Sequence, residues 1–356
     1  MKCLLHIGTE KTGTTLLQDW LYDNQEHLST LGVYLSDNLG KTNNRLLVAY
    51  FQSYLDDWAK RNGIGDEIEK ERYFDGFLDK LRSEIALASV THDIFIITSE
   101  HFHSRFSQRN DIERLWSFLM TVFDEVEVVC YFRDQFDVAV SLYSTQLTTS
   151  TCEDIEAVVE QAKPENFYYN YLLIADNWSE VFGRGNCRFR IYDRERFFGN
   201  DIRLDFLNLI REGIDASNFN MERQSSNESL TLLQSVGYKA VNKTIPYWQP
   251  DHLGMNRINW RAKVQLSKLD SLKFGKLASK KQQLIRDRFR DSNAALIEKY
   301  FDVGDKFPES QTSKASDITT EQALAALEDA FKFGLEFHNS GIGENSLSDS
   351  EIDVLR

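Results

Sequence analysis

The chain has 356 residues, of which 42% are hydrophobic and 27% are charged, and it contains only four prolines. This composition is that of a globular protein large enough for a substantial core, in two domains or one large one, and it argues against long disordered linkers. The formal net charge of −14 excludes binding of nucleic acid through the overall charge of the protein.

Five short apolar runs are predicted to be β-strands. They are residues 2–8, 31–36, 93–99, 126–132 and 187–193. Helical patterns lie between and after them, at 14–28, at 42–90 with a break at 61–66, and at 109–123, 137–147, about 201–211 and 319–337. Strands that alternate with helices predict an α/β fold, a P-loop-like parallel sheet flanked by helices, with helical insertions and a mainly helical C-terminal part.

The cysteines and the first residues bear on the compartment of the protein. Cys3, Cys130, Cys152 and Cys187 form no CxxC pair, which is typical of reduced structural thiols. The opening residues MKCLLHIG lead directly into a strand, without the apolar stretch of a secretory leader. No apolar run approaches the roughly 20 residues of a membrane span. We therefore expect a soluble cytoplasmic protein with no membrane span.

The loop GTEKTGTT at residues 8–15 joins the first predicted strand to the first predicted helix. Its two glycines have Walker A spacing, but a Walker lysine follows the second glycine, whereas here Lys11 precedes Gly13. Gly13 permits a tight turn, the amides at the helix start favour an anion, and Thr14 and Thr15 add hydroxyl groups. The alternative is a glycine turn with an incidental threonine cap. The order of strand, KTGTT and amphipathic helix favours the anion site.

The stretch LLHIGTEKTGTTLLQDWL resembles the 5′-phosphosulfate loop of the sulfotransferases that use 3′-phosphoadenosine 5′-phosphosulfate (PAPS). It is most similar to their bacterial, carbohydrate-sulfotransferase-like branch. The resemblance implies that Lys11, Thr12, Gly13, Thr14 and Thr15 wrap the 5′-phosphate of this cofactor. It also implies that Lys11 steadies the bridging oxygen as the sulfuryl group leaves.

A second stretch, VEVVCYFRDQFDVAVSLYSTQL at 126–147, is similar to the 3′-phosphate motif of the same family. Arg133 stands at the end of the strand and Ser141 follows eight residues on, within the next helix. A guanidinium fork suits a phosphate because several N–H groups meet its oxygens. Taken alone, Arg133 is better explained by an ion pair with Asp134 or Asp137, and Ser141 by a bond back to its own helix turn. Together, at this spacing and after the KTGTT loop, the two residues favour the phosphate site.

Sulfuryl transfer to a hydroxyl group needs a proton acceptor near the nucleophile. Open α/β sheets bind ligands at the carboxyl ends of their strands, and there the stretch IITSEHFHS supplies Glu100, His101 and His103. The resemblance implies Glu100 as the base, because bacterial relatives carry a glutamate at this turn. Other sulfotransferases use a histidine, which keeps His101 as a second candidate. The alternative is that Glu100 is an acid at a helix N-terminus and both histidines are exposed in a loop.

The resemblance covers residues 1–30 and 93–150 well and 187–302 loosely, which implies a sulfotransferase domain over 1–302. Three further parts are predicted: a helical insertion at 36–92, a helical and loop region at 215–302 that closes the site, and an acidic helical extension and tail at 303–356. Residues 256–290 carry eleven Lys or Arg against two Asp, which predicts either a solvated helix face or the border of an anionic ligand.

A member of this family would transfer a sulfuryl group from PAPS to a hydroxyl or amine, in line and without a metal ion, and would release adenosine 3′,5′-bisphosphate. By family habit the acceptor is a carbohydrate, although relatives that act on small molecules share both phosphate motifs. Two alternatives stay open. A P-loop kinase or NTPase predicts a lysine after Gly13 and a strand that ends in aspartate, and a non-catalytic relative keeps only the nucleotide site. The sequence carries no indication of an oligomeric state.

Overall fold

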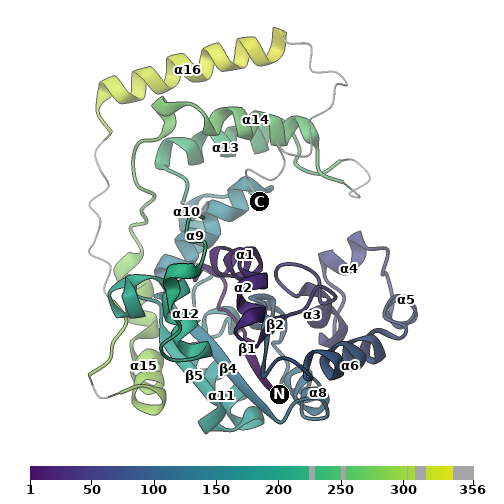
Figure 1. The fold of residues 1–356 in the computed structure, drawn as a ribbon. Helices are drawn as coiled ribbons and strands as arrows, with labels where there is room; N and C mark the ends of the chain where they lie inside the picture. The colour runs from purple at the N-terminus through teal and green to yellow at the C-terminus, as the bar shows by residue number, and fades with distance from the viewer. Residues whose placement is uncertain (224–228, 250–253, 303, 309–317, 340–356) are drawn as a thin grey trace. The chain divides into compact units, whose positions relative to one another are not determined.

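The computed structural model describes residues 1–223, 229–249, 254–302, 304–308 and 318–339 (Figure 1). Its five strands form one sheet in the order β2-β3-β1-β4-β5, and every neighbouring pair is parallel. The strands are β1 Lys2–His6, β2 Val33–Leu35, β3 Ile94–Thr98, β4 Glu125–Phe132 and β5 Cys187–Ile191. The five predicted strands and their parallel pairing are therefore confirmed.

Helices lie between the strands and make up most of the C-terminal part, as predicted. The first eight are α1 Thr14–Asp23, α2 Gln25–Thr30, α3 Arg45–Phe51, α4 Asp57–Arg61, α5 Glu67–Tyr73, α6 Phe77–Ala88, α7 His101–Arg105 and α8 Arg109–Leu119. They are followed by α9 Gln135–Thr148, α10 Ile155–Val159, α11 Tyr171–Phe182 and α12 Ile202–Ile210. The last four are α13 Leu232–Thr244, α14 Arg257–Ser267, α15 Gln282–Tyr300 and α16 Thr320–Asn339.

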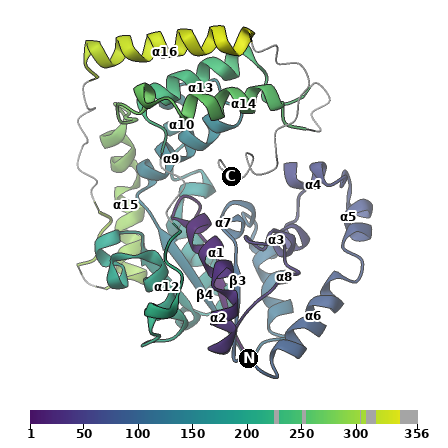
Figure 2. The same cartoon turned by 45° about the horizontal axis from the view of Figure 1, so that its top comes forward.

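Helices cover both faces of the sheet because the strands carry apolar side chains on both faces. Leu5 of β1 packs on one face with apolar residues of α8 and α11, whereas Leu4 packs on the other face with α1 and α12. Figure 2 shows α1 lying across the strands. All five residues of β3 are buried, and each fully buried Leu, Ile or Phe side chain contributes roughly 1.5–3 kcal/mol. This pattern explains why continuous apolar runs predicted the strands.

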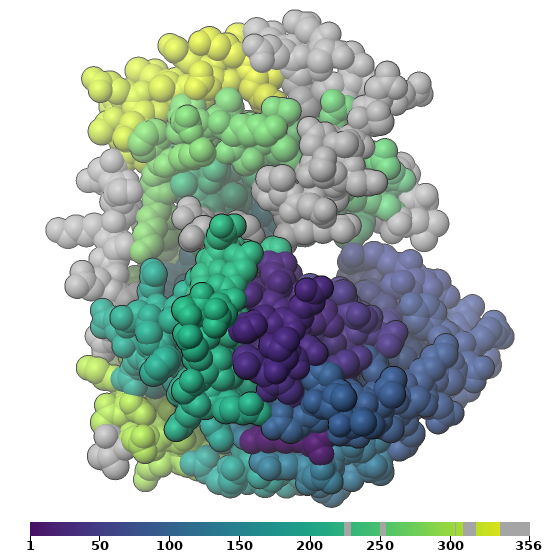
Figure 3. Space-filling model, in the orientation of Figure 1, coloured from purple at the N-terminus to yellow at the C-terminus, as the bar shows by residue number. Residues whose placement is uncertain are grey.

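The helix predicted over 14–28 is instead two helices that meet at Asn24. The Asn24 amide donates to the carbonyls of Trp20 at 2.9 Å and Asn220 at 3.2 Å, and its Oδ1 accepts the Asn220 N–H at 2.7 Å. Figure 3 shows the purple atoms of this N-terminal region beside the green-teal atoms that lead up to residue 223. The break thus depends on a partner some 200 residues away, which helical periodicity does not reveal.

The chain divides into two compact units. The first comprises Met1–Asp134, Lys163–Ser225 and Phe289–Pro308 and contains the whole sheet. The second comprises Gln135–Ala162, Ser226–Arg288 and Glu309–Arg356. The predicted domain limits at 302 and 303 stay a prediction. Over the described part of the chain, no helix combines the length and the apolar character that a membrane crossing requires.

Lys263 of α14 is a fully buried cation in the second unit. Its ammonium group donates to the carbonyls of Thr148 at 3.1 Å and Thr149 at 2.6 Å, at the C-terminal end of α9. It also lies 5.0 Å from the centroid of the Tyr247 ring. The last carbonyl groups of a helix lack partners within the helix, so N–H donors of a side chain are favourable there. Lys263, which belongs to the basic run 256–290, therefore stabilises the end of a helix. It is neither on a solvated helix face nor at the border of an anionic ligand, the two roles predicted for this run.

The buried Lys263 predicts a pH dependence of stability. Burial lowers the pKa of Lys263 to about 7 from its ordinary value of 10.5. Between these values the unfolded chain binds one more proton than the folded chain, so stability rises with pH. We compare the free energy of unfolding of the parent with that of Lys263→Met. The difference, parent minus variant, should rise between about pH 7.5 and about pH 9.5, by at most about 1.4 kcal/mol per pH unit. Urea denaturation of both proteins across this range measures it, and a flat or falling difference would contradict the assignment.

Candidate active site

The loop that follows β1 is held against β4 by its own backbone and threonines. The Thr9 amide and hydroxyl both donate to the Tyr131 carbonyl, each at 3.0 Å. The Thr12 hydroxyl donates to the Thr9 carbonyl at 2.5 Å, and Thr12 is buried. The hydroxyl group of Thr12 therefore stabilises the conformation of the loop. The part of Thr12 that is suited to bind an anion is its backbone N–H.

Three residues of this loop have positive φ, and the first of them is Gly8 at φ +100°. Lys11 has φ +66° and Gly13 has φ +72°. Gly13 is the N-cap of α1, whose first amides have no partners within the helix. Backbone turns of this kind, followed by a helix start, form a concave set of N–H groups that suits a phosphate. A Cβ added at Gly13 would lie 3.2 Å from the Tyr192 hydroxyl, so a side chain there would press on Tyr192 and displace either that side chain or the loop.

Gly13→Ala tests the cradle, with Gly76→Ala as a matched control. Gly76 is also the N-cap of an α-helix, α6, and it has a left-handed backbone conformation at φ +67°. A Cβ added at Gly76 meets nothing within 4 Å. Both alanines incur a left-handed backbone cost of roughly 1–2 kcal/mol. We expect adenosine 3′,5′-bisphosphate to bind about tenfold or more weakly to Gly13→Ala and unchanged to Gly76→Ala, by calorimetry. If both variants bound the bisphosphate equally well, the loop would not be part of its binding site.

Lys11 lies among charged side chains at the carboxyl edge of the sheet. Burial lowers the pKa of Lys11, while the nearby carboxylates of Glu10 and Glu100 oppose this shift and Arg133 adds to it. Arg133 Nη1 donates to the Lys11 carbonyl at 2.9 Å, and its guanidinium lies 5.6 Å from the Tyr192 ring centroid. The structure thus brings Arg133, from the second motif, to the loop of the first.

Three further predicted phosphate ligands lie at the starts of helices or within them: Ser141 in α9, and Thr14 and Thr15 at the start of α1. Ser141 lies on α9, in the second unit, so its role as a phosphate ligand stays a prediction. Thr14 and Thr15 are the first two residues of α1; Thr14 is buried and Thr15 is partly exposed. Their roles at the 5′-phosphate also stay predictions.

Glu100 and His101 follow β3 and adjoin the loop. Glu100 is the N-cap residue of α7, without a capping bond from its own side chain. Instead, its Oε2 accepts the Gln18 amide at 2.6 Å. His101 Nε2 lies 3.8 Å from Glu100 Oε1, and His101 Nδ1 lies 4.0 Å from Glu10 Oε1. Burial lowers the pKa of His101, so the imidazole is neutral at neutral pH and is able to accept a proton.

His103 has a structural role, and the alternative that it is exposed in a loop is wrong. Only 1% of the residue is exposed. Its Nδ1 accepts the Glu10 N–H at 3.2 Å, and its Nε2 lies 2.8 Å from the Tyr168 carbonyl, to which it donates as Nε2–H. One ring nitrogen therefore holds the loop at Glu10, and the other bonds to the backbone of Tyr168.

The sequence analysis missed Glu10, Gln18, Tyr168 and Tyr192. Glu10 lies beside Lys11, and its Oε2 accepts the Tyr168 hydroxyl at 2.9 Å. An acid next to the loop lysine was the available signal for Glu10. Tyr192 directly follows β5 at the same carboxyl edge as Arg133, which was a comparable signal. Tyr168 gave no such signal. Groups of three or more His, Cys, Asp or Glu able to hold a metal ion are not found among the described residues.

Comparisons with known proteins give distant matches. No model of a protein family matches the chain. An uncharacterized protein of Archaeoglobus fulgidus is 25% identical over 179 residues, which are 48% of this chain and 47% of that protein. The chain thus spans about half the length of the curated relative that it matches. The crystal structure of a sulfotransferase from Alicyclobacillus acidocaldarius aligns with 72% of this chain and 98% of its own, at a TM-score of 0.35 and 14% identity. Because these similarities are too low to assign a function, the function proposed below is argued from the residues of the site.

Proposed function

We propose that this protein is a PAPS-dependent sulfotransferase that moves a sulfuryl group to a hydroxyl of an acceptor, by family habit a carbohydrate. The observation that carries the proposal is the grouping of Lys11, Arg133, Glu100 and His101 around one loop at the carboxyl edge of the sheet. Transfer from a phosphosulfate needs positive charge at the leaving phosphate and a proton acceptor at the attacking oxygen. These residues supply both.

The residues present fit the nucleotide. The left-handed turns at Lys11 and Gly13 and the start of α1 suit the 5′-phosphate, and Arg133 suits the 3′-phosphate. The resemblance adds Ser141 to the 3′-phosphate ligands as a prediction. When bound, PAPS would supply the sulfuryl group and a phosphate as leaving group. A Cβ at Gly8 would lie 3.1 Å from Glu100 Cα, so the glycine at this position lets the loop approach the proposed base closely.

Lys11 and Glu100 have complementary tasks in this proposal. The Lys11 ammonium stabilises negative charge as it develops on the leaving oxygen, an effect that is large because the group is held in place beforehand. Glu100 Oε2 is bonded to Gln18, so Oε1, on the side of His101, is the atom that receives the acceptor's proton. His101 orients the acceptor hydroxyl and is the second candidate for the base.

Product analysis tests the proposal. The protein is incubated in EDTA with PAPS and a panel of neutral and acidic sugars. Chromatography then measures adenosine 3′,5′-bisphosphate, and mass spectrometry detects sulfated sugar. We expect both products in equal amounts with at least one acceptor. The proposal would be contradicted if no sulfated product formed with any acceptor while ATP was turned over with magnesium.

A further inference from the structure

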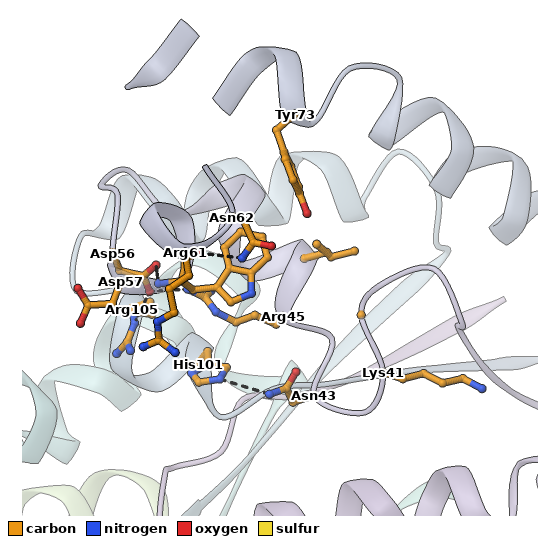
Figure 4. Close-up of a pocket in the computed structure, with 13 residues that line it drawn as sticks. Lys41, Asn43, Arg45, Asp56, Asp57, Arg61, Asn62, Tyr73, His101 and Arg105 are labelled. Carbon is orange, nitrogen blue, oxygen red and sulfur yellow. Dashed lines mark hydrogen bonds and ion pairs between the residues drawn. The ribbon is translucent and has the colours of Figure 1, made fainter. Parts of the chain in front are cut away.

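A cavity of about 550 Å³ lies beside His101 within the first unit, and most of its lining residues belong to the predicted insertion at 36–92. Figure 4 shows His101 among these residues, with a dashed line that joins it to Asn43. The Asn43 amide nitrogen lies 3.4 Å from His101 Nε2. An amide nitrogen only donates hydrogen bonds, so Nε2 accepts this one and the proton of the neutral ring lies on Nδ1.

The other ring nitrogen of His101 lies near a carboxylate of the loop that follows β1. Nδ1 is buried and has no hydrogen-bond partner among the residues that the structure describes. It lies 4.0 Å from Glu10 Oε1, which is too far for a hydrogen bond but close enough for a negative charge to act on the ring. Burial would raise the pKa of Glu10, but the imidazoles and hydrogen bonds around it lower this pKa. Glu10 is therefore ionised at neutral pH and favours a proton on Nδ1.

The carboxylates of Glu10 and Glu100 are each held by one oxygen. Glu10 Oε2 accepts the Tyr168 hydroxyl at 2.9 Å, and Glu100 Oε2 accepts the Gln18 amide at 2.6 Å. Their Oε1 atoms are the ones nearer to His101, with that of Glu10 close to Nδ1 and that of Glu100 3.8 Å from Nε2. The imidazole thus lies between two anchored carboxylates.

The two carboxylates favour opposite positions of the ring proton. Glu100 attracts it to Nε2, and a proton there would leave no lone pair at the cavity for an acceptor hydroxyl. Glu10 and the Asn43 amide favour the proton on Nδ1 instead. If the charge of Glu10 were removed, Glu100 would be the carboxylate that acts on the ring, and the balance would move toward Nε2.

Arginines near His101 also act on the ring. Burial has the largest effect on the pKa of His101 and lowers it, and Arg45 and Arg105 lower it further. The carboxylates of Glu100 and Glu10 oppose this shift without reversing it. The ring is therefore neutral at neutral pH. What the neighbouring groups decide is which of its two nitrogens carries the proton.

We propose that Glu10 is a positioning residue that keeps the proton of His101 on Nδ1, so that Nε2 presents its lone pair to the acceptor hydroxyl. The inference rests on the proposed sulfuryl transfer, in which His101 orients that hydroxyl or takes its proton. Either task needs an Nε2 without a proton. A carboxylate beside one nitrogen of an imidazole is a general means of fixing where the ring proton lies.

Nitrogen-15 NMR of protein with labelled histidine tests this inference, because the chemical shift of each ring nitrogen depends on whether it carries the proton. The signals missing from His101→Asn are those of His101. We expect the Nδ1–H form to predominate in the parent at neutral pH. Glu10→Gln should lower the ratio of the Nδ1–H form to the Nε2–H form by about threefold or more, because it removes the charge near Nδ1.

Two further variants make this measurement specific. Glu100→Gln removes the charge near Nε2 and should raise the ratio instead. Tyr168→Phe removes the hydrogen bond to Glu10 but keeps the charge, so the ratio should change by less than about twofold. A predominant Nε2–H form in the parent, an unchanged ratio in Glu10→Gln, or equal changes in Glu10→Gln and Tyr168→Phe would overturn the proposal.

A double-mutant cycle links the position of the proton to the reaction. With an acceptor found by product analysis, we expect Glu10→Gln to lower kcat/KM by about tenfold in the parent and by less than about twofold in His101→Asn. Equal losses in both backgrounds would mean that Glu10 does not act through His101, and would overturn its positioning role. If the NMR ratios are as expected but no acceptor is sulfated, the sulfotransferase proposal fails and the control of the His101 proton by Glu10 stands.

Discussion

Lys11→Met should lower the rate of sulfuryl transfer by about 10²- to 10³-fold. Methionine keeps an unbranched side chain, one atom shorter than that of lysine, and removes the charge, and like lysine it is a non-glycine residue at this left-handed position, where φ is +66°. The ammonium is needed most when negative charge develops on the leaving oxygen, so the loss should fall on kcat more than on binding. Steady-state kinetics of parent and variant with one acceptor at saturation measure it.

Binding of adenosine 3′,5′-bisphosphate is the control for Lys11→Met. If the loop amides and Arg133 hold the nucleotide as proposed, they still do so in this variant, and the affinity should fall by no more than about tenfold. A variant that binds the nucleotide and transfers at the parental rate would refute the catalytic role of Lys11. A variant that no longer binds it would make Lys11 a binding residue.

Glu100→Gln should lower kcat by about 10²- to 10⁴-fold, the usual contribution of a general base. Glutamine has nearly the same shape and keeps a carbonyl oxygen for the Gln18 amide, which lies 2.6 Å from Glu100 Oε2 in the parent. The substitution therefore tests proton acceptance with little change in packing. Parent and variant are compared at saturating PAPS and acceptor.

His101→Asn separates the two candidate bases. If His101 orients the hydroxyl and Glu100 takes the proton, His101→Asn should raise KM more than it lowers kcat. If the larger loss of kcat falls on His101→Asn and Glu100→Gln is nearly active, the histidine is the base. Because burial lowers the pKa of His101, transfer that depends on the neutral imidazole would persist below the ordinary histidine value of 6.5.

Most of the sheet was predictable from the sequence, because parallel strands buried on both faces are continuous apolar runs. β3 and β4 each bury nearly all of their side chains. The loop was predictable because a strand, a glycine turn and a helix start are local features. The helix break at Asn24 was not, since its hydrogen bonds reach Asn220. Local patterns thus defined the elements, and long-range bonds altered their ends.

The surroundings of the candidate site were less predictable. His103 reads as a loop residue, but its burial depends on Tyr168, which is 65 positions away. Arg61 and His101 line one cavity, although 40 positions separate them and the segment around Arg61 resembles no motif. The division of the chain between Asp134 and Gln135 is also invisible in the motif that contains Arg133 and Ser141. Tertiary packing, which a single sequence does not display, decides all three.

Calorimetric titration with adenosine 3′,5′-bisphosphate tests the central claim most directly. The EDTA-treated protein is titrated with the bisphosphate and, in parallel, with ATP and magnesium. Arg133→Ala is the variant, and Arg109→Ala, at a surface arginine that pairs with Glu113 and Glu180, is the control. The account predicts metal-free binding of the bisphosphate that weakens about tenfold or more in Arg133→Ala and is unchanged in Arg109→Ala. Binding of ATP with magnesium but not of the bisphosphate would contradict the account and assign the loop to a phosphoryl-transfer enzyme.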